Sequence, residues 1–377
     1  MRYFCYIFCV IILVTITSCR EDIYIHPSSS NIVDNPRITG VEGFYLINEG
    51  NMGSNKATLD YFDETTGIYY RNIYAERNPN VVKELGDVGN DIEIYGSKLY
   101  AVINCSHKVE VMRASDATSI ARIDIPNCRY AVGYGPHIYV SSYVSPVQDD
   151  PKAPLGAIFK VDTTSLKIVG RVDVGYQPEE MAISNGKIYI ANSGGYRAPN
   201  YDRTVLVVDL ATFRVVKDID VDINLHRVKC DSRGMIYVTS RGDYAYQPSK
   251  LYLIDPMRDE VIAQVNTPVS DMWIHGDSAY IYSSARNDIT HSTTASYSIL
   301  NLKTLSIVDD KIIKDGTDIN IKKPHGIAVH PITGEIYITD ARNYVSSGRV
   351  HCYSPEGVLK WTQTTGEIPS QFAFVVK

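Results

Sequence analysis

Hydrophobic and polar residues alternate in many short stretches of the chain, and this period of two is typical of β-strands with one buried face. One such stretch recurs with a tyrosine at its centre, around Tyr45, Tyr100, Tyr139, Tyr189, Tyr237, Tyr280 and Tyr337. These tyrosines stand 39 to 57 residues apart. A four-stranded propeller blade needs roughly 40 to 50 residues, so this is propeller spacing. The sequence therefore predicts seven copies of one β unit.

The residues around each tyrosine complete the unit. A short apolar stretch such as "EEMAIS" or "HGIAVH" precedes the tyrosine strand, and two further strands follow it, for example within Thr204 to Val221 and Lys250 to Thr267. Turns that contain Asp or Gly join these later strands, as in antiparallel hairpins. Each unit is therefore expected to hold four antiparallel strands, ordered from the centre of a ring outward.

The two ends of the repeat region complement each other. The first unit begins with its tyrosine strand at Gly43 to Gly50 and lacks an innermost strand, whereas Ser370 to Lys377 reads as an innermost strand with nothing after it. Pairing of these two strands closes the ring and leaves no strand edge bare inside it. We predict an all-β fold in which residues 41–377 form a seven-bladed β-propeller closed by its C-terminal and N-terminal strands.

The N-terminus is expected to be a targeting segment. Arg2 precedes the apolar run Tyr3 to Thr17, which is short for a membrane span. "ITSC", ending at Cys19, resembles the bacterial lipobox, and "REDIYI" after it is similar to the export tag of Bacteroidetes surface lipoproteins. We expect residues 1–18 to be a lipoprotein signal peptide and residues 19–40 a flexible linker lipidated at Cys19, with a plain secretory signal as the alternative. The expected location is the outer membrane, lipid-anchored and facing the cell exterior.

Composition narrows the possible partners. The chain has 28 tyrosines, which suit both strands and recognition surfaces, and a net charge of −6 with an isoelectric point near 5.9. Because nucleic-acid binding depends on clustered Lys and Arg, an acidic chain without such a cluster argues against that partner. Exported proteins can form disulfides, so Cys105 and Cys128 are a candidate pair; the alternative is four buried thiols, including Cys230 and Cys352.

The long connections favour one face of the ring. They lie between the second and third strands of the units and after the fourth strand, positions that share one rim of a propeller and commonly carry binding groups. Their tyrosines offer flat contact surfaces, and their Arg and Asn side chains offer directional hydrogen bonds. The candidate ligand-binding residues are Tyr143, Tyr196, Arg197, Tyr201, Arg203, Arg241, Tyr244, Tyr246, Arg286, Asn287, Arg342, Asn343 and Tyr344.

The sequence shows few signs of catalytic chemistry. His325 and His330 are the only close histidine pair, and their odd separation places them on opposite faces of a strand. Asp149 and Asp150 form an acidic turn that we interpret as solvated rather than calcium-binding. We therefore predict no catalytic residue, no metal site and no cofactor, and we expect that the protein is not an enzyme.

Four stretches resemble known propeller families. Lys322 to Asn343 looks like an NHL-type repeat, and Gln177 to Gly195 looks like the YncE-like, surface-layer-type propellers. Tyr45 to Asp63 and Ser354 to Phe374 are similar to a group of Bacteroidetes surface lipoproteins with seven-bladed YncE-like propellers, which includes BtuG-type proteins. That resemblance implies capture of cobalamin or a related corrinoid and its transfer to a TonB-dependent outer-membrane transporter.

Three functions remain open at this point. The first is a binding protein that captures a small ligand, most plausibly a corrinoid, on the loop-rich face, because tyrosine platforms with Asn and Arg donors suit a broad molecule rich in amides. The second is an adhesin or accessory subunit that binds a glycan or a protein there. The third is a propeller enzyme of lactonase or quinoprotein type, which requires acids, histidines or a metal at the channel mouth.

Overall fold

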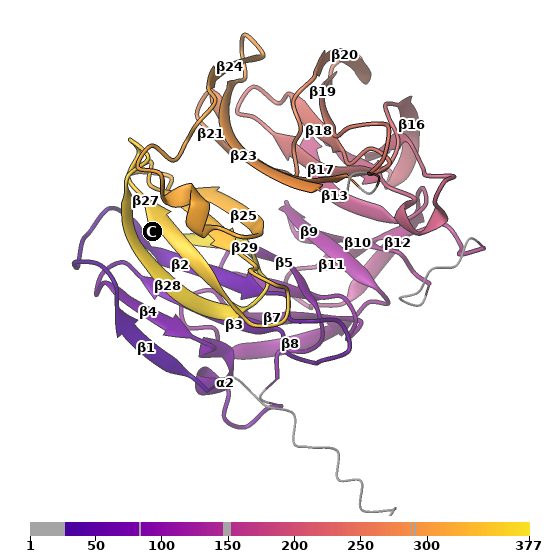
Figure 1. Ribbon diagram of the computed structural model, residues 1–377. Helices are drawn as coiled ribbons and strands as arrows, with labels where there is room; N and C mark the ends of the chain where they lie inside the picture. Colours follow the sequence, from indigo (N-terminus) through magenta and orange to yellow (C-terminus); the bar gives the residue numbers. More distant parts are fainter. Residues whose placement is uncertain (1–26, 83, 146–151, 288, 290–291) are drawn as a thin grey trace, which may run out of the picture.

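The computed structural model describes residues 27–377 except 83, 146–151, 288 and 290–291, and leaves out the side chains of 285–287 and 292–294. Seven antiparallel sheets are arranged around a common centre, as Figure 1 shows. Each sheet contributes four strands to the ring, and the first sheet carries one more at its outer edge. The predicted seven-bladed β-propeller is therefore confirmed.

The blades are numbered along the chain, and their strands are given from the centre outward. Blade 1 consists of β29 (Pro369–Val376), β2 (Val41–Asn48), β3 (Thr58–Asp63), β4 (Ile68–Arg71) and β1 (Ser29–Ile32). Blade 2 consists of β5 (Gly89–Tyr95), β6 (Lys98–Ile103), β7 (Lys108–Arg113) and β8 (Ser119–Asp124). Blade 3 consists of β9 (Cys128–Tyr134), β10 (His137–Ser142), β11 (Ala157–Asp162) and β12 (Ile168–Asp173).

The remaining four blades repeat the same order. Blade 4 consists of β13 (Pro178–Ser184), β14 (Lys187–Asn192), β15 (Thr204–Asp209) and β16 (Arg214–Asp220). Blade 5 consists of β17 (Leu225–Cys230), β18 (Ile236–Ser240), β19 (Lys250–Asp255) and β20 (Glu260–Val265). Blade 6 consists of β21 (Asp271–His275), β22 (Ser278–Asn287), β23 (Ser292–Asn301) and β24 (Ser306–Asp309). Blade 7 consists of β25 (Pro324–Val329), β26 (Ile336–Asp340), β27 (Ser347–Tyr353) and β28 (Leu359–Glu367).

Short helices lie in the connections between strands. They are α2 (Ile73–Arg77), η1 (Gly195–Arg197) and η2 (Thr317–Asn320). None of the described helices has the length and hydrophobicity that crossing a membrane requires.

Blade 1 joins the two ends of the chain. β29 pairs antiparallel with β2, and Leu46 lies opposite Phe372 in that register. At the other edge of the blade, β1 pairs with β4 over Ser29 to Ile32. β1 lies within residues 19–40, the interval that we expect to act as a linker, so this part of the interval is held against the propeller.

The recurring tyrosines explain how blades adhere. Six of the seven are almost completely buried, and Tyr280 is half-buried. Three of their hydroxyls donate to the following blade: Tyr45 to the carbonyl of Ala114 at 3.0 Å, Tyr189 to Asp259 Oδ1 at 2.5 Å, and Tyr237 to the carbonyl of Leu302 at 3.2 Å. Among the described residues, the buried Tyr100 hydroxyl has no hydrogen-bond partner. A tyrosine at this place thus fills the space between two blades, and in three units its hydroxyl also bonds across that space.

Loop lengths differ between the two faces as predicted. Two-residue connections at 96–97, 135–136, 185–186 and 276–277 join first to second strands. Gly96, Gly135 and Gly276 open three of these turns with positive φ, as tight hairpin turns require. The connections that begin at residues 143, 193 and 241 follow second strands and leave them at the opposite face. The expected loop in blade 6 differs, because β22 and β23 continue their pairing to Asn287 and Ser292.

The four described cysteines are unpaired thiols. Cys128 is completely buried, and its thiol contacts the backbone carbonyls of Ile103 and Lys108 at 3.5 and 3.3 Å. Burial raises the pKa of the Cys128 thiol to about 12. Of the two alternatives that the sequence left open for Cys105 and Cys128, the structure has separate thiols.

Candidate functional site

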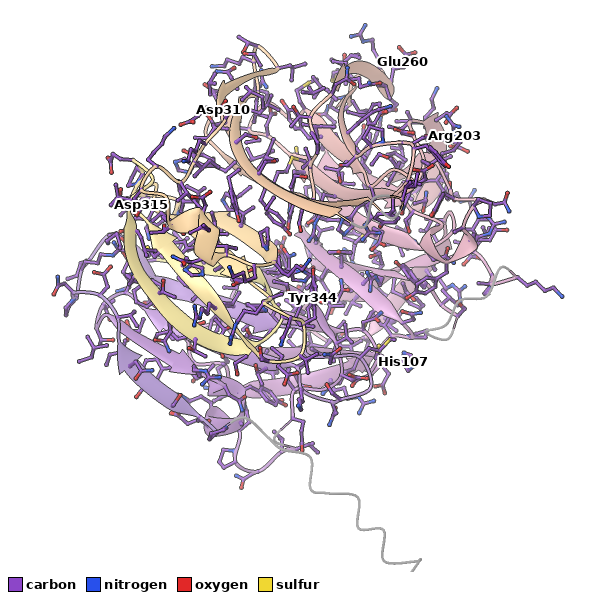
Figure 2. All side chains as sticks on the ribbon, in the orientation of Figure 1. His107, Arg203, Glu260, Asp310, Asp315 and Tyr344 are labelled. Carbon is purple, nitrogen blue, oxygen red and sulfur yellow. The ribbon has the colours of Figure 1, made fainter. Side chains whose placement is uncertain are left out.

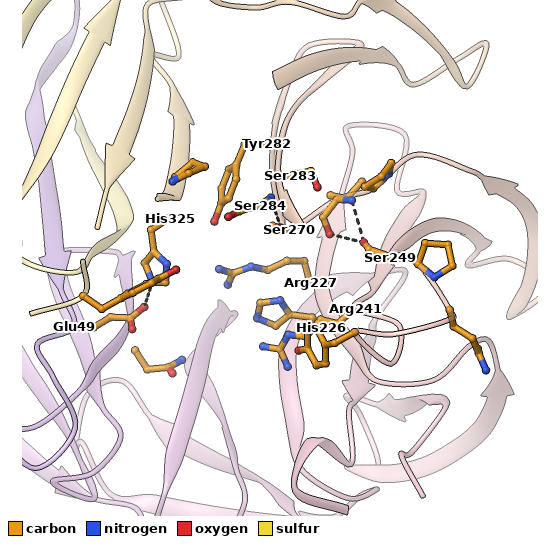
Figure 3. A pocket seen from close by; sticks show the side chains of 18 of the residues that line it. Glu49, His226, Arg227, Arg241, Ser249, Ser270, Tyr282, Ser283, Ser284 and His325 are labelled. Carbon is orange, nitrogen blue, oxygen red and sulfur yellow. Dashed lines mark hydrogen bonds and ion pairs between the residues drawn. The ribbon is translucent and has the colours of Figure 1, made fainter. Parts of the chain in front are cut away.

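A pocket of ≈ 840 Å³ opens at the loop-rich end of the central channel (Figure 3). Its floor comes from the first residues of innermost strands, including Arg129 and Tyr130 of β9 and His226 and Arg227 of β17. Its walls come from the long connections, among them residues 244–249. The pocket therefore lies where the ring brings the starts of several innermost strands together.

Glu179 organises one side of the floor from behind it. The buried carboxylate accepts hydrogen bonds from Arg129 Nη2 and Arg241 Nη1, both at 3.1 Å, and from the hydroxyl of Tyr143 at 2.6 Å. Burial disfavours its ionised form, but Arg129 and Arg241 outweigh that effect and lower the pKa of Glu179 to about 2. One fixed carboxylate thus holds two arginines at the edge of the pocket.

Arg227 crosses the middle of the floor. Its Nη2 pairs with Asp271 Oδ2 at 2.9 Å, and its Nη1 donates to the hydroxyl of Tyr130 at 3.1 Å. His226 lies beside them, with Nε2 3.0 Å from the Tyr130 hydroxyl. Burial and the surrounding positive charges of Arg241 and Arg227 keep the pKa of His226 well below its usual value, so this imidazole is neutral at pH 7.

A hydrogen-bonded pair of an imidazole and a carboxylate stands across the pocket. His325 Nε2 lies 2.9 Å from Glu49 Oε1, and Figure 3 shows both side chains facing Arg227 across the cavity. Burial opposes ionisation of Glu49, yet His325, Arg129 and Arg227 lower the pKa of its carboxyl. The two sides of the pocket are therefore electrostatically linked.

Serines and tyrosines line the upper wall. Ser270 Oγ accepts a hydrogen bond from the backbone N–H of Ser284 at 2.9 Å, and Tyr282 is buried next to them. Tyr244 and Tyr344 stand half-exposed at the rim, and Tyr246 is 84% exposed. The pocket thus combines cationic groups at its base with hydroxyls and flat rings toward its opening.

Four of the thirteen predicted binding residues line this pocket. They are Arg241, Tyr244, Tyr246 and Tyr344. Tyr143 and Tyr196 lie behind it, with their rings 5.5 Å apart and the Tyr143 hydroxyl bound to Glu179. These two tyrosines support the floor instead of lining it.

The other predicted residues are placed elsewhere or not described. Arg197 stacks on Tyr176 at 3.6 Å, and Arg203 pairs with Asp220 at 2.5 Å on the outer part of blade 4; in Figure 2 Arg203 lies far from Tyr344. Arg342 Nη1 donates to the carbonyl of Ser347, and the Asn343 amide oxygen accepts from nearby backbone N–H groups. Tyr201 is half-buried outside the pocket lining. Arg286 and Asn287 belong to β22, and their side chains are outside the described ones.

Sequence reasoning missed most of the floor and part of the wall. The residues that it did not select are Glu49, Asn90, Arg129, Tyr130, His226, Arg227, Ser270, Tyr282 and His325. Several belong to the short apolar strands that precede each tyrosine strand, where "CRY", "LHR" and "PHG" open the innermost strands. A polar or charged residue at the start of an innermost strand was the available signal.

A second pocket, of ≈ 600 Å³, lies at the other end of the channel. Asp91, Glu93 and Glu180 line it together with Lys229, whose Nζ lies 2.6 Å from Glu180 Oε1. Burial raises the pKa of Asp91 to about 6, and burial with the nearby charge of Asp91 raises that of Glu93 to about 8. The two mouths therefore differ in their ionisable groups: arginines line one, and carboxyl groups together with Lys229 line the other.

Metal ligands do not gather in the described part of the chain. There, no group of three or more His, Cys, Asp or Glu side chains is placed to hold a metal ion.

Comparisons with known proteins support the fold. A quinonprotein alcohol dehydrogenase-like protein from Bacteroides thetaiotaomicron is 16% identical, with a TM-score of 0.61 over 90% of this chain and 79% of that one. A 6-phosphogluconolactonase, so named as putative, from Bacteroides uniformis is 11% identical, with a TM-score of 0.62 over 89% and 99%. Hydrazine synthase of Kuenenia stuttgartiensis is 16% identical, with a TM-score of 0.58 over 71% and 77%. At these identities the likeness concerns the fold alone.

Comparison with sequence families gives a more specific result than comparison with structures. No curated protein matches the chain. The model of a domain of unknown function, DUF5074, matches residues 42–374, which span the propeller from its first tyrosine strand to its closing strand. The chain therefore belongs to the DUF5074 family.

Proposed function

We propose that the protein captures a small molecule in the channel-mouth pocket and does not transform it. The supporting observation is the pocket itself. It has a volume of ≈ 840 Å³, lies at the mouth of the ring and is lined by arginines, hydroxyls and tyrosine rings. Concave sites of this size with a few directed polar groups are typical of small-molecule binding. The pocket is framed by strand ends and ion pairs, so little ordering accompanies binding.

A corrinoid is the ligand that we propose. The sequence resembles YncE-like surface lipoproteins of the BtuG type, and the pocket rim carries Tyr244, Tyr246 and Tyr344, whose rings suit a broad, partly apolar face. Arg241 and the serines of the wall offer donors and acceptors for peripheral amides. Under this proposal cobalamin lies across the channel mouth, with the tyrosines at its edge.

The proposed cellular role follows from the N-terminal sequence. A lipid on Cys19 would tether the propeller to the outer membrane, and the loop-rich face would present captured ligand to a TonB-dependent transporter. Residues 1–26, which include Cys19, lie outside the described part of the chain.

Co-elution provides the test. Purified protein is mixed with cyanocobalamin and separated by gel filtration, with absorbance of the corrinoid followed in the protein peak. We expect the red ligand to elute with the protein at one equivalent. Elution of all the ligand at its own volume would remove the corrinoid proposal.

The Glu49 and His325 pair favours one second candidate, a hydrolase. A carboxylate that orients an imidazole beside arginines is an arrangement that general-base catalysis can use. One structural neighbour is named as a putative 6-phosphogluconolactonase. Hydrolysis of that lactone, followed as acid release, would support this candidate if Glu49→Gln abolished it; no turnover by the wild type would end it.

A further inference from the structure

We propose that Arg129 and Arg241 form a subsite for an oxyanion, a carboxylate or phosphoryl group, carried by the captured ligand. The inference rests on the proposed function, because it names a chemical feature of a ligand bound in the same pocket. It follows from the hydrogen-bonding capacity of the two side chains and from the charge around them.

The two arginines keep donors available to a ligand. A guanidinium carries five N–H donors. Arg129 directs Nε and Nη2 to Glu179 Oε2 at 3.3 and 3.1 Å, and Arg241 directs Nη1 to Glu179 Oε1 at 3.1 Å. Within the part of the chain that the structure describes, their other N–H groups have no protein partner. Both side chains line the pocket and are 14% and 25% exposed.

Glu179 positions the two arginines without neutralising both of their charges. Its Oε1 also accepts the Tyr143 hydroxyl at 2.6 Å, so its acceptor positions are largely occupied. One carboxylate then balances two guanidinium groups. Arg227 has its own partner in Asp271, at 2.9 Å, and Glu49 is engaged by His325. Glu49, across the pocket, also interacts with the charges of Arg129 and Arg227, so the excess of guanidinium over carboxylate is local to Arg129, Arg241 and Glu179.

The positions of the two arginines favour an anion at this mouth of the channel. Arg129 and Arg241 are anchored on the same carboxylate, so their donors are fixed with respect to each other. Planar guanidinium groups match the geometry of carboxylate and phosphate oxygens, and the cost of ordering them is already met by Glu179. The pocket at the opposite mouth is lined by the carboxyl groups of Asp91, Glu93 and Glu180, and the Lys229 ammonium there is already paired with Glu180, so that pocket is less suited to an anion.

Anion titration provides the test. Full-chain protein at pH 7.5 is titrated calorimetrically with inorganic phosphate and, separately, with acetate, at constant ionic strength. Wild type is compared with Arg241→Gln and Arg241→Lys, and with Arg122→Gln as the control, because Arg122 pairs with Asp124 on the outer strand of blade 2. Urea unfolding of each variant verifies that it is folded.

We expect saturable binding of at least one anion to the wild type. Arg241→Gln is expected to weaken it about tenfold or more, because a charge-assisted hydrogen bond is lost. Arg241→Lys keeps the charge and should retain part of the affinity, and Arg122→Gln should match the wild type. Preference for phosphate or for acetate identifies the oxyanion as phosphoryl or carboxylate.

Two results would overturn the subsite: no saturable binding of either anion, or equal affinities of wild type and Arg241→Gln. The cyanocobalamin co-elution separates this outcome from failure of the proposed function. Retained corrinoid with no anion binding contradicts only the subsite. Anion binding that depends on Arg241, without corrinoid retention, contradicts only the corrinoid.

Discussion

Phe372 of the last strand lies opposite Leu46 of the first blade, in the antiparallel register that closes the ring. The Phe372 ring packs 5.3 Å from that of Phe44 and 6.1 Å from that of Tyr337 in blade 7. One side chain near the C-terminus thus joins the first blade to the last.

Loss of the Phe372 side chain should destabilise the whole propeller. Phe372→Ala is expected to lower the free energy of unfolding by about 3–5 kcal/mol, because a buried aromatic ring leaves a cavity. Urea unfolding followed by tyrosine fluorescence measures the change. Tyr246→Ala, which removes an 84% exposed side chain, serves as control and should stay within about 0.5 kcal/mol of the wild type. Equal losses in both variants would argue against closure by β29.

Glu179 should make stability depend on pH. Its pKa is about 2 in the folded protein and ordinarily 4.5, so its contribution is present above about pH 4.5 and is lost as the pH falls toward 2. At pH 7 Glu179→Gln leaves two arginines without their carboxylate and should cost about 3–5 kcal/mol. Urea unfolding at pH 7 and pH 3 compares the variant with the wild type.

The difference in unfolding free energy between wild type and Glu179→Gln should narrow at pH 3, because the Glu179 carboxyl of the unfolded chain is then protonated and must lose its proton on folding. Glu260→Gln, at an exposed position of β20, is the control and should show little change at either pH. A gap of the same size at both pH values would contradict the assigned role of Glu179.

Arg37 should hold the N-terminal segment against the ring. Its guanidinium pairs with Glu335 of blade 7 at 2.5 Å and also with Glu64 of blade 1. Burial opposes ionisation of Glu335, but Arg37 and Lys360 outweigh it and lower its pKa to about 2. Arg37→Ala is therefore expected to speed amide hydrogen exchange in Ser29 to Ile32. Arg171→Ala, which removes an exposed pair on β12, should leave that exchange unchanged; unchanged exchange in Arg37→Ala would refute the role.

The repeating architecture was predictable because each unit carries its own local sequence pattern. A buried tyrosine at the same place in each unit, and a lone strand at each end, require no knowledge of distant contacts. β1 escaped prediction because "SSNI" carries little hydrophobic pattern and pairs only at an outer edge. The extension of β22 and β23 escaped it because their polar tips read as a loop.

The site was only partly predictable. Tyr244, Tyr246 and Tyr344 lie in long connections, where the sequence itself indicates exposure. Arg129 and Arg227 lie inside strands, and their inward position depends on how the ring closes. The buried partners Glu179 and Asp271 come from neighbouring blades, so no local pattern reveals their pairing. Tyr143, predicted as a ligand-binding residue, lies behind the floor, where its hydroxyl donates to Glu179.

Two tyrosines of similar exposure at opposite mouths allow the most direct test of the central claim, that the loop-rich mouth binds the ligand. Tyr244, 41% exposed, lines the pocket there, and Tyr134, 49% exposed, lines the pocket at the other end. Isothermal titration with cyanocobalamin compares Tyr244→Ala and Tyr134→Ala with the wild type. Our account predicts about tenfold weaker binding for Tyr244→Ala and unchanged binding for Tyr134→Ala. Weaker binding for Tyr134→Ala alone, or no binding to the wild type, would contradict it.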